Sequence, residues 1–307
     1  MKSTPLVSVL INNYNYAAFL KCAINSALTQ TYKNLEVIVV DDGSADSSRE
    51  ILESYAGQIR TILKPNGGQA SAFNVGIQAC RGEWICMLDS DDYWLQNKVD
   101  WVVQTANAHP KANLIYHRVQ NVDRDGVPLG IPWPKRVYGG DLAPVVQRSG
   151  GWWPYPPTTA LSFRRSFLKS IPEVPEIDFR TCADAYLADL APFLGEVIGI
   201  PKVLSDYRQH SNNLYSGRSE RMVIERYLLR HGALNRALET LGSTTRVSLE
   251  DHFPYQYARY RLGEGDRYKM SVVALKFPWN SVIQKSRGLA GLWLRARPTT
   301  PLQEARP

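Results

Sequence analysis

The first 120 residues alternate between short apolar runs and amphipathic stretches, and this alternation constrains the fold more than any other feature. Five apolar or β-branched runs predict strands: LVSVLI, LEVIVV, IRTIL, EWICML and NLIYH. The segments between them, near residues 17–29, 46–55, 69–80 and 95–108, predict helices. Strands and helices that alternate in series predict an α/β fold with a mostly parallel central sheet and helices on both faces.

Polar and glycine-rich segments follow each of the first four predicted strands. NNYN follows the first strand, DDGSAD the second, KPNGGQ the third and DSDD the fourth. In an open α/β sheet the ligand crevice lies at the carboxyl ends of the strands. We therefore expect these four segments to line one binding site.

The DSDD segment places three carboxylates, Asp89, Asp91 and Asp92, within four residues. Charges of the same sign repel at such spacing, so the cluster is either a solvated turn that caps the next helix or a site for a cation. Mg²⁺ and Mn²⁺ prefer oxygen ligands, and beside a phosphate they need only one or two protein carboxylates. The pattern favours a metal that in turn holds a diphosphate.

A second acidic segment, VVDDGSADS, ends the second predicted strand. Asp46 stands where it can cap the following helix, whereas Asp42 does not. A carboxylate at a strand end can accept a hydrogen bond from a nucleobase or a ribose hydroxyl. Because no GxGxxG follows the first strand, a nicotinamide or flavin site of that type is disfavoured.

Charge and cysteine usage narrow the class of protein. The net charge of +7 lies entirely in residues 216–307, with 16 Lys and Arg against 8 Asp and Glu, so we expect no nucleic-acid partner for the motif-bearing region. Four scattered cysteines without a CxxC pair are typical of a reducing compartment. Without an apolar run of 18 residues or a signal sequence, the chain is expected to be cytoplasmic.

Two later segments have open interpretations. The loop of residues 123–157 is rich in Pro, Gly and Trp, and its aromatic residues either form a platform for a sugar ring or pack the loop onto the core; they are Trp133, Trp152, Trp153 and Tyr155. Residues 276–297 mix apolar and basic residues, as in an interfacial helix on an anionic membrane. The alternative is a helix that packs on the rest of the protein.

Four segments together resemble the inverting glycosyltransferases of family 2, which have the GT-A fold. They are VSVLINNYNYAAFLKCAINSALTQTYKNLEVIVVDDGSADSS, NGGQASAFNVGI, RGEWICMLDSDDYW and YRQHSNN, and they cover about residues 5–215. The resemblance implies transfer of a sugar from a nucleotide-diphosphate sugar to a hydroxyl of a glycan or lipid-linked glycan, with Mn²⁺ or Mg²⁺ as cofactor. It also implies a role in cell-surface polysaccharide or glycoconjugate biosynthesis. The basic and apolar C-terminal segment predicts peripheral association at the inner face of the plasma membrane.

The resemblance places the catalytic domain in residues 1–215 and leaves residues 216–307 as a basic, mainly helical region. Within the catalytic domain it implies donor-binding roles for several residues. Tyr14 would stack on the base, Asp42 would bond to its edge, and Asp91 would contact the ribose. Asn12 falls beside the nucleoside, and Arg208 falls near the diphosphate.

The resemblance further implies that Asp89, Asp92 and His210 hold the metal and that Asp184, in CADAYL, is the general base. A metal that acts as a Lewis acid and a carboxylate that removes the acceptor proton would meet the needs of such a transfer. Structural alternatives are a helix N-terminal charge for Asp184 and a structural histidine for His210. Asp189 is the reserve candidate for the base.

Two residues depart from the family's pattern. Phe73 stands where many members have Arg, and Ala183 replaces the usual acidic residue before the base. These departures suggest the competing interpretation, a non-catalytic nucleotide-sugar-binding module of the same fold. A sugar nucleotidyltransferase would need a Gly-rich, basic loop after the first strand, and NNYNYAAF has neither property.

Overall fold

A computed structural model describes residues 4–210 and 219–279 of the chain, and it divides the protein into two compact units. The first unit comprises residues 1–142 and 155–214, and the second comprises residues 143–154 and 215–307. Residues 143–154, within the Pro- and Trp-rich loop, therefore group with the C-terminal part of the chain.

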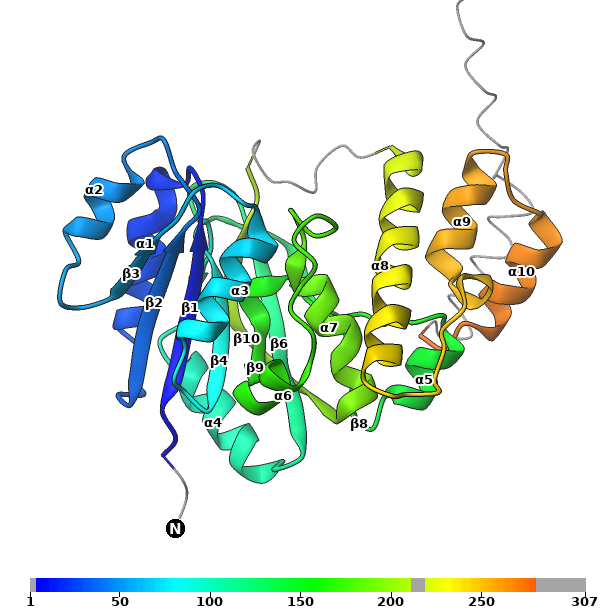
Figure 1. Ribbon diagram of the computed structural model, residues 1–307, viewed down its shortest axis with the longest axis horizontal. Helices are drawn as coiled ribbons and strands as arrows, with labels where there is room; N and C mark the ends of the chain where they lie inside the picture. The colour runs from blue at the N-terminus through cyan, green and yellow to red at the C-terminus, as the bar shows by residue number, and fades with distance from the viewer. Residues whose placement is uncertain (1–3, 211–218, 280–307) are drawn as a thin grey trace, which may run out of the picture. The chain divides into compact units, whose positions relative to one another are not determined.

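The first unit is built on one sheet with the strand order β3-β2-β1-β4-β9-β6-β10-β5 (Figure 1). Parallel pairing joins β3, β2, β1 and β4 in series and also joins β6 to β10, whereas β9 runs antiparallel between β4 and β6. The strands are β1 Val7–Asn13, β2 Leu35–Asp41, β3 Arg60–Leu63, β4 Trp84–Asp89, β5 Tyr93–Trp94, β6 Ala112–Val122, β7 Pro128–Trp133, β8 Gly139–Gly140, β9 Leu161–Arg164 and β10 Glu196–Arg208. The predicted α/β class with a mostly parallel central sheet is confirmed.

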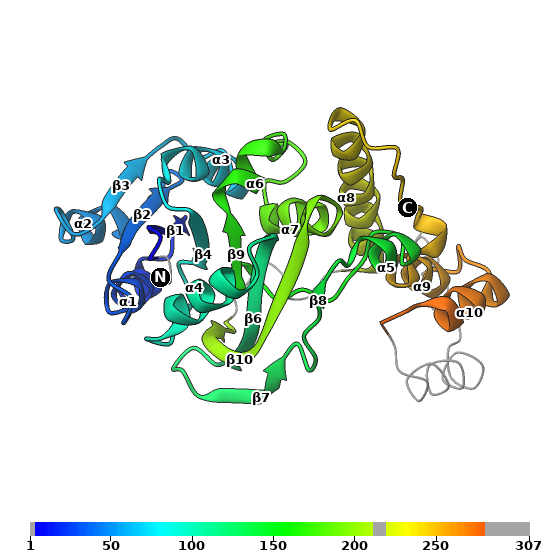
Figure 2. The ribbon, with the colours of Figure 1, turned by 90° about the horizontal axis from the view of Figure 1, so that it is seen from below.

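Helices cover both faces of this sheet (Figure 2). One face carries α1, α2 and α4, and the other carries α3, α6 and α7. The helices of the first unit are α1 Ala17–Leu28, α2 Ser48–Glu53, α3 Gln69–Ala79, α4 Lys98–Ala108, α6 Arg165–Ser170 and α7 Ala183–Leu194.

The central strands read as continuous apolar runs because both of their faces are covered. Val7, Val9 and Ile11 of β1 are inaccessible to solvent, as are Cys86 and Leu88 of β4. The strands β1, β2 and β4 end in polar residues, namely Asn12 and Asn13, Asp41, and Asp89. The switch from apolar to polar residues in the sequence therefore marks the edge of the sheet where the site lies.

The second unit is helical, with α5 Ala143–Arg148, α8 Glu220–Thr240, α9 Phe253–Arg261 and α10 Arg267–Lys276. Side chains cap the last three of these helices, namely Ser219, His252 and Asp266. Trp153 is buried, and the Trp152 ring packs on Phe277 and Trp279. Packing therefore accounts for two aromatic residues of the predicted sugar platform.

Within residues 4–210 and 219–279, no helix is both long enough and apolar enough to cross a membrane. Most of the predicted interfacial segment, residues 280–297, lies outside the described residues. All four cysteines carry free thiols, in keeping with their scattered positions.

Candidate functional site

The polar strand ends meet at one edge of the sheet. In the strand register Asn12 of β1 lies opposite Asp89 of β4, and Asn13 of β1 lies opposite Asp41 of β2. The segment after β3 joins them, because Lys64 contacts the carboxylate of Asp42. The structure thus brings together all four segments that the sequence placed at strand ends.

Arg208, at the end of β10, braces the acidic turn that follows β4. Its backbone N–H donates to Oδ1 of Asp92 at 2.7 Å, and its Nε donates to the carbonyl of Asp91 at 2.9 Å. The guanidinium lies over the rings of Phe19 and Tyr93, 5.0 and 5.1 Å from their centroids. Arg208 is buried, and in this structure it stabilises the turn through these hydrogen bonds.

Burial and mutual repulsion make the ionised form of the carboxylates in this turn unfavourable. Asp92 is 1% exposed, and its Oδ2 has no hydrogen-bond partner among the described residues. Burial and the neighbouring Asp91 and Asp89 raise the pKa of Asp92 well above its usual range. Burial, Asp91 and Asp184 raise the pKa of Asp89 to about 8. Arg208 and His210 contact the turn, yet the pKa values of Asp89 and Asp92 are still raised, so a further positive charge would stabilise these buried carboxylates as anions.

These residues fit a hard divalent cation, since they offer carboxylate oxygens and one of those oxygens is buried without a partner. In the described part of the chain, however, no three His, Cys, Asp or Glu side chains gather as a ready-made metal site. His210 lies next to the turn: its Nε2 is 3.1 Å from Oδ2 of Asp91, and its ring stacks on Phe19. Among the carboxylates of the turn, Asp91 is therefore the one that the structure shows bonded to His210.

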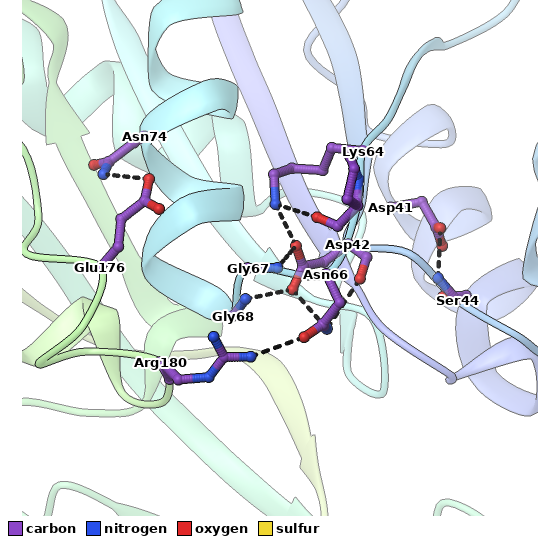
Figure 3. Close-up of polar contacts among 11 residues, drawn as sticks. Asp41, Asp42, Ser44, Lys64, Asn66, Gly67, Gly68, Asn74, Glu176 and Arg180 are labelled. Atoms are coloured by element: carbon purple, nitrogen blue, oxygen red, sulfur yellow. Dashed lines mark hydrogen bonds and ion pairs between the residues drawn. The ribbon is translucent and has the colours of Figure 1, made fainter.

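The carboxylate of Asp42, by contrast, accepts hydrogen bonds from four donors (Figure 3). Oδ1 accepts from Nζ of Lys64 at 2.6 Å and from the N–H of Gly67 at 2.9 Å. Oδ2 accepts from the side chain of Asn66 at 3.0 Å and from the N–H of Gly68 at 2.7 Å. A carboxylate has about four lone-pair positions, so these bonds to the loop after β3 occupy all the acceptor positions of Asp42.

Asp184 is the second residue of α7 and lies close enough to the acidic turn to raise the pKa of Asp89. Its helix begins after Cys182, whose backbone is left-handed with φ of 61°. Asp184 is partly exposed, whereas Asp189 on the same helix is 4% exposed. The two candidates for the base therefore differ in burial, and Asp184 is one of the residues that raise the pKa of Asp89.

The remaining predicted residues lie at the end of β1. The Tyr14 side chain is 47% exposed, as a ring that stacks on a ligand would require. The carbonyl oxygen of the Asn12 side chain is buried and lacks a hydrogen-bond partner within the described chain. Phe73 and Ala183, the two departures from the family pattern, are fully buried. Phe73 is therefore a core residue of α3.

Sequence reasoning missed three residues near the site. Tyr16 lies edge-on to His210, and burial and the three aspartates of the acidic turn raise the pKa of its hydroxyl. Lys64 belongs to the loop after β3 and Gln69 is the first residue of α3, a region that the sequence marked only by its two glycines. The aromatic repeat in NNYNY was a usable signal for Tyr16, but no local pattern distinguishes the other two.

Comparison with known proteins gives a consistent result. The sequence profile described as "Glycosyl transferase family 2" matches residues 8–169. An uncharacterized glycosyltransferase of Nostoc sp. is 31% identical over 266 residues, which are 83% of this chain and 82% of that protein. The chondroitin synthase of Pasteurella multocida is 36% identical over 136 residues, 43% of this chain but 14% of the synthase.

Two solved structures share the fold. The S. aureus TarS fragment 1–349, in complex with UDP-GlcNAc, has a TM-score of 0.55 and 18% identity over 93% of this chain and 90% of its own. The mannosyltransferase PcManGT from Pyrobaculum calidifontis, in complex with GDP-Man and Mn²⁺, has a TM-score of 0.50 and 18% identity over 94% of this chain and 80% of its own.

Proposed function

The chain belongs to glycosyl transferase family 2, and from this premise we propose that it transfers a sugar, with inversion, from a nucleotide-diphosphate sugar to a hydroxyl of a glycan or lipid-linked glycan. The observation that carries the proposal is the buried acidic turn after β4, with the unpartnered oxygen of Asp92 at the edge of the sheet and Asp184 nearby. A site built to hold the negative diphosphate directly would not concentrate carboxylates in this way.

Asp89 and Asp92 are the proposed holders of Mn²⁺ or Mg²⁺. The bound cation would supply positive charge that stabilises the departing diphosphate. It would also neutralise the carboxylates whose pKa values are raised in its absence. His210 is paired with Asp91, and we propose that this contact keeps Asp91 oriented at the turn.

The nucleoside of the donor is proposed to lie against Asn12 and Tyr14. The exposed ring of Tyr14 offers a stacking surface, and the unpartnered amide oxygen of Asn12 offers a hydrogen-bond acceptor. Because four internal donors already occupy the carboxylate of Asp42, a bond from Asp42 to the base requires one of them to be exchanged. The names of TarS and PcManGT make UDP-GlcNAc and GDP-Man sensible first donors to test.

A polysaccharide or glycoconjugate is the proposed acceptor class, in keeping with the similarity to chondroitin synthase. The C-terminal basic region is proposed to bring the protein to an anionic membrane, where a lipid-linked acceptor resides. A panel of nucleotide sugars, with Mn²⁺ or a chelator, tests the donor proposal through thermal stabilisation and release of free nucleotide. Binding without any release would favour the non-catalytic interpretation.

Asp184→Asn tests the general base, because the amide keeps the size of the side chain but cannot accept a proton. We expect nucleotide release to fall by about 10²- to 10⁴-fold with donor affinity nearly unchanged. Initial rates of donor hydrolysis and isothermal titration measure the two quantities.

The matched control is Asp189→Asn, five residues along the same helix. Its carboxylate is buried, so we expect lower stability but retained turnover per folded molecule. Retained turnover in Asp184→Asn together with lost turnover in Asp189→Asn would show that the base is misassigned.

A further inference from the structure

The start of α3 is bonded to the segment that leads into α7. The N–H of Gln69 donates to the carbonyl of Arg180 at 2.9 Å, and the N–H of Ala70 donates to the carbonyl of Phe179 at 3.2 Å. Gly68 has φ of +91°, and a Cβ there would lie 2.8 Å from Cα of Arg180. The two backbones approach so closely that only glycine fits at this position.

The side chain of Gln69 reaches the first turn of α7. Its Oε1 accepts the N–H of Ala183 at 2.9 Å, across 114 residues of sequence. Ala183 is the first residue of α7, and Asp184 is the second. The first N–H groups of a helix have no partner within the helix, and no side-chain cap comes from Cys182. Gln69 therefore supplies from another helix the acceptor that a local cap would normally supply.

The loop that precedes Gln69 is bonded to Asp42 (Figure 3). Gly67 and Gly68 donate their N–H groups to the carboxylate, and Asn66 bonds both to Asp42 and to Arg180. One continuous set of hydrogen bonds thus runs from Asp42, through residues 66–69, to the residue before Asp184.

From this geometry, and resting on the proposed role of Asp184, we propose that Gln69 is a positioning residue for the general base. Its amide oxygen fixes the first turn of α7 and so the place of the Asp184 carboxylate. Through the rest of the loop, Asp42 and Asp184 are held by one structural unit. A base displaced by about 1 Å can lose about 10²-fold in rate, so the loss of this single hydrogen bond is sufficient to matter for turnover.

The test compares Gln69→Leu with Gln78→Leu. Both glutamines lie on α3, but the side chain of Gln69 bonds to Ala183 at the start of α7, whereas that of Gln78 bonds to Glu173, well before Asp184 in the chain. With the donor that the wild-type protein hydrolyses fastest in Mn²⁺, we expect Gln69→Leu to lower kcat by about 10- to 10²-fold with the donor dissociation constant within about twofold. Gln78→Leu should change neither quantity.

A third variant separates positioning from general damage. Gln69→Glu keeps an oxygen acceptor for the Ala183 N–H, so kcat at alkaline pH should return to within a few-fold of wild type. It also places a negative charge beside the base, which should move the acidic limb of the kcat profile to higher pH. Recovery of kcat in Gln69→Glu but not in Gln69→Leu would tie turnover to the acceptor oxygen at residue 69.

Amide hydrogen exchange gives a readout independent of activity. We expect the amides of Ala183 and Asp184 to exchange faster in Gln69→Leu than in wild type or Gln78→Leu, while the strands of the sheet keep their protection. Equal kcat in Gln69→Leu and Gln78→Leu, or unchanged exchange at Ala183, would overturn the positioning role. Failure of the wild-type protein to hydrolyse any donor would count against the proposed function, and the exchange measurement would still decide whether Gln69 caps α7.

Discussion

The two acidic strand ends of this protein look alike in sequence but differ in structure. DDGS after β2 and DSDD after β4 both place adjacent aspartates at the carboxyl edge of the sheet. The carboxylate of Asp42 is fully occupied by four donors, whereas Asp92 keeps one buried oxygen without a partner in the described structure. Donors of the protein itself satisfy the carboxylate of Asp42, whereas the described residues leave one oxygen of Asp92 without a donor.

The difference shows how a carboxylate cluster can be classified. Donors that come from the protein make the charge part of the fold, as Gly67 and Gly68 do for Asp42. Carboxylates that face mainly one another have raised pKa values, as Asp89 and Asp92 do. Such a cluster lowers stability by itself, so a ligand-binding role explains its presence better than a structural one.

The largest expected effect belongs to the satisfied site. Asp42→Ala removes an acceptor shared by Lys64, Asn66 and two backbone N–H groups, and it leaves four donors of a part-buried network without their common acceptor. We expect the free energy of unfolding to fall by about 3 kcal/mol. Urea unfolding of metal-free protein measures the change. A loss below about 1 kcal/mol would contradict the view that Asp42 stabilises the fold whereas the acidic turn does not.

Asp92→Asn should behave in the opposite way. The amide oxygen can still accept the N–H of Arg208, but the crowded negative charge is gone, so metal-free stability should be equal or higher. The variant should lose the stabilisation of about 2.7 kcal/mol that a donor at 100 times its dissociation constant gives the wild-type protein in Mn²⁺. Thermal unfolding with and without donor measures both parts, and undiminished donor stabilisation would remove Asp92 from the metal site.

His117 sharpens the comparison because it is also buried with an unpartnered atom, its Nε2, in the part of the chain that the structure describes. Burial and the nearby Lys98 lower the pKa of His117 from 6.5 to about 3. The folded protein keeps it neutral while the unfolded chain takes up a proton below pH 6.5, so stability falls as pH drops from about 6.5 towards 3. An unpartnered atom in cationic surroundings therefore predicts acid sensitivity and no metal site.

His117→Gln removes this titration. Between pH 7.5 and pH 5.0 the variant should lose about 2 kcal/mol less of its free energy of unfolding than the wild-type protein loses. Urea unfolding at the two pH values gives the comparison, and Mn²⁺ should leave the difference unchanged. Equal losses in both proteins would mean that His117 takes up its proton in the folded state as readily as in the unfolded chain.

The sequence by itself determined the α/β class, the strands β1 to β4 and the polar segments at their carboxyl ends, because periodicity and turn residues act over a few neighbours. The family resemblance also came from local motifs, and the match over residues 8–169 confirms it. Asp89, Asp91 and Asp92 were recognisable as a candidate site for the same reason, because three carboxylates within four residues form a local pattern.

Only the tertiary structure decided which carboxylates are satisfied. The donors to Asp42 come from 22 to 26 residues further along the chain, and the acceptor for Ala183 comes from Gln69 at 114 residues' distance. It also inserted the antiparallel β9 between β4 and β6, and it grouped residues 143–154 with the C-terminal helices. Hydrogen-bond partners at such separations depend on how the whole chain packs, so no local pattern specifies them.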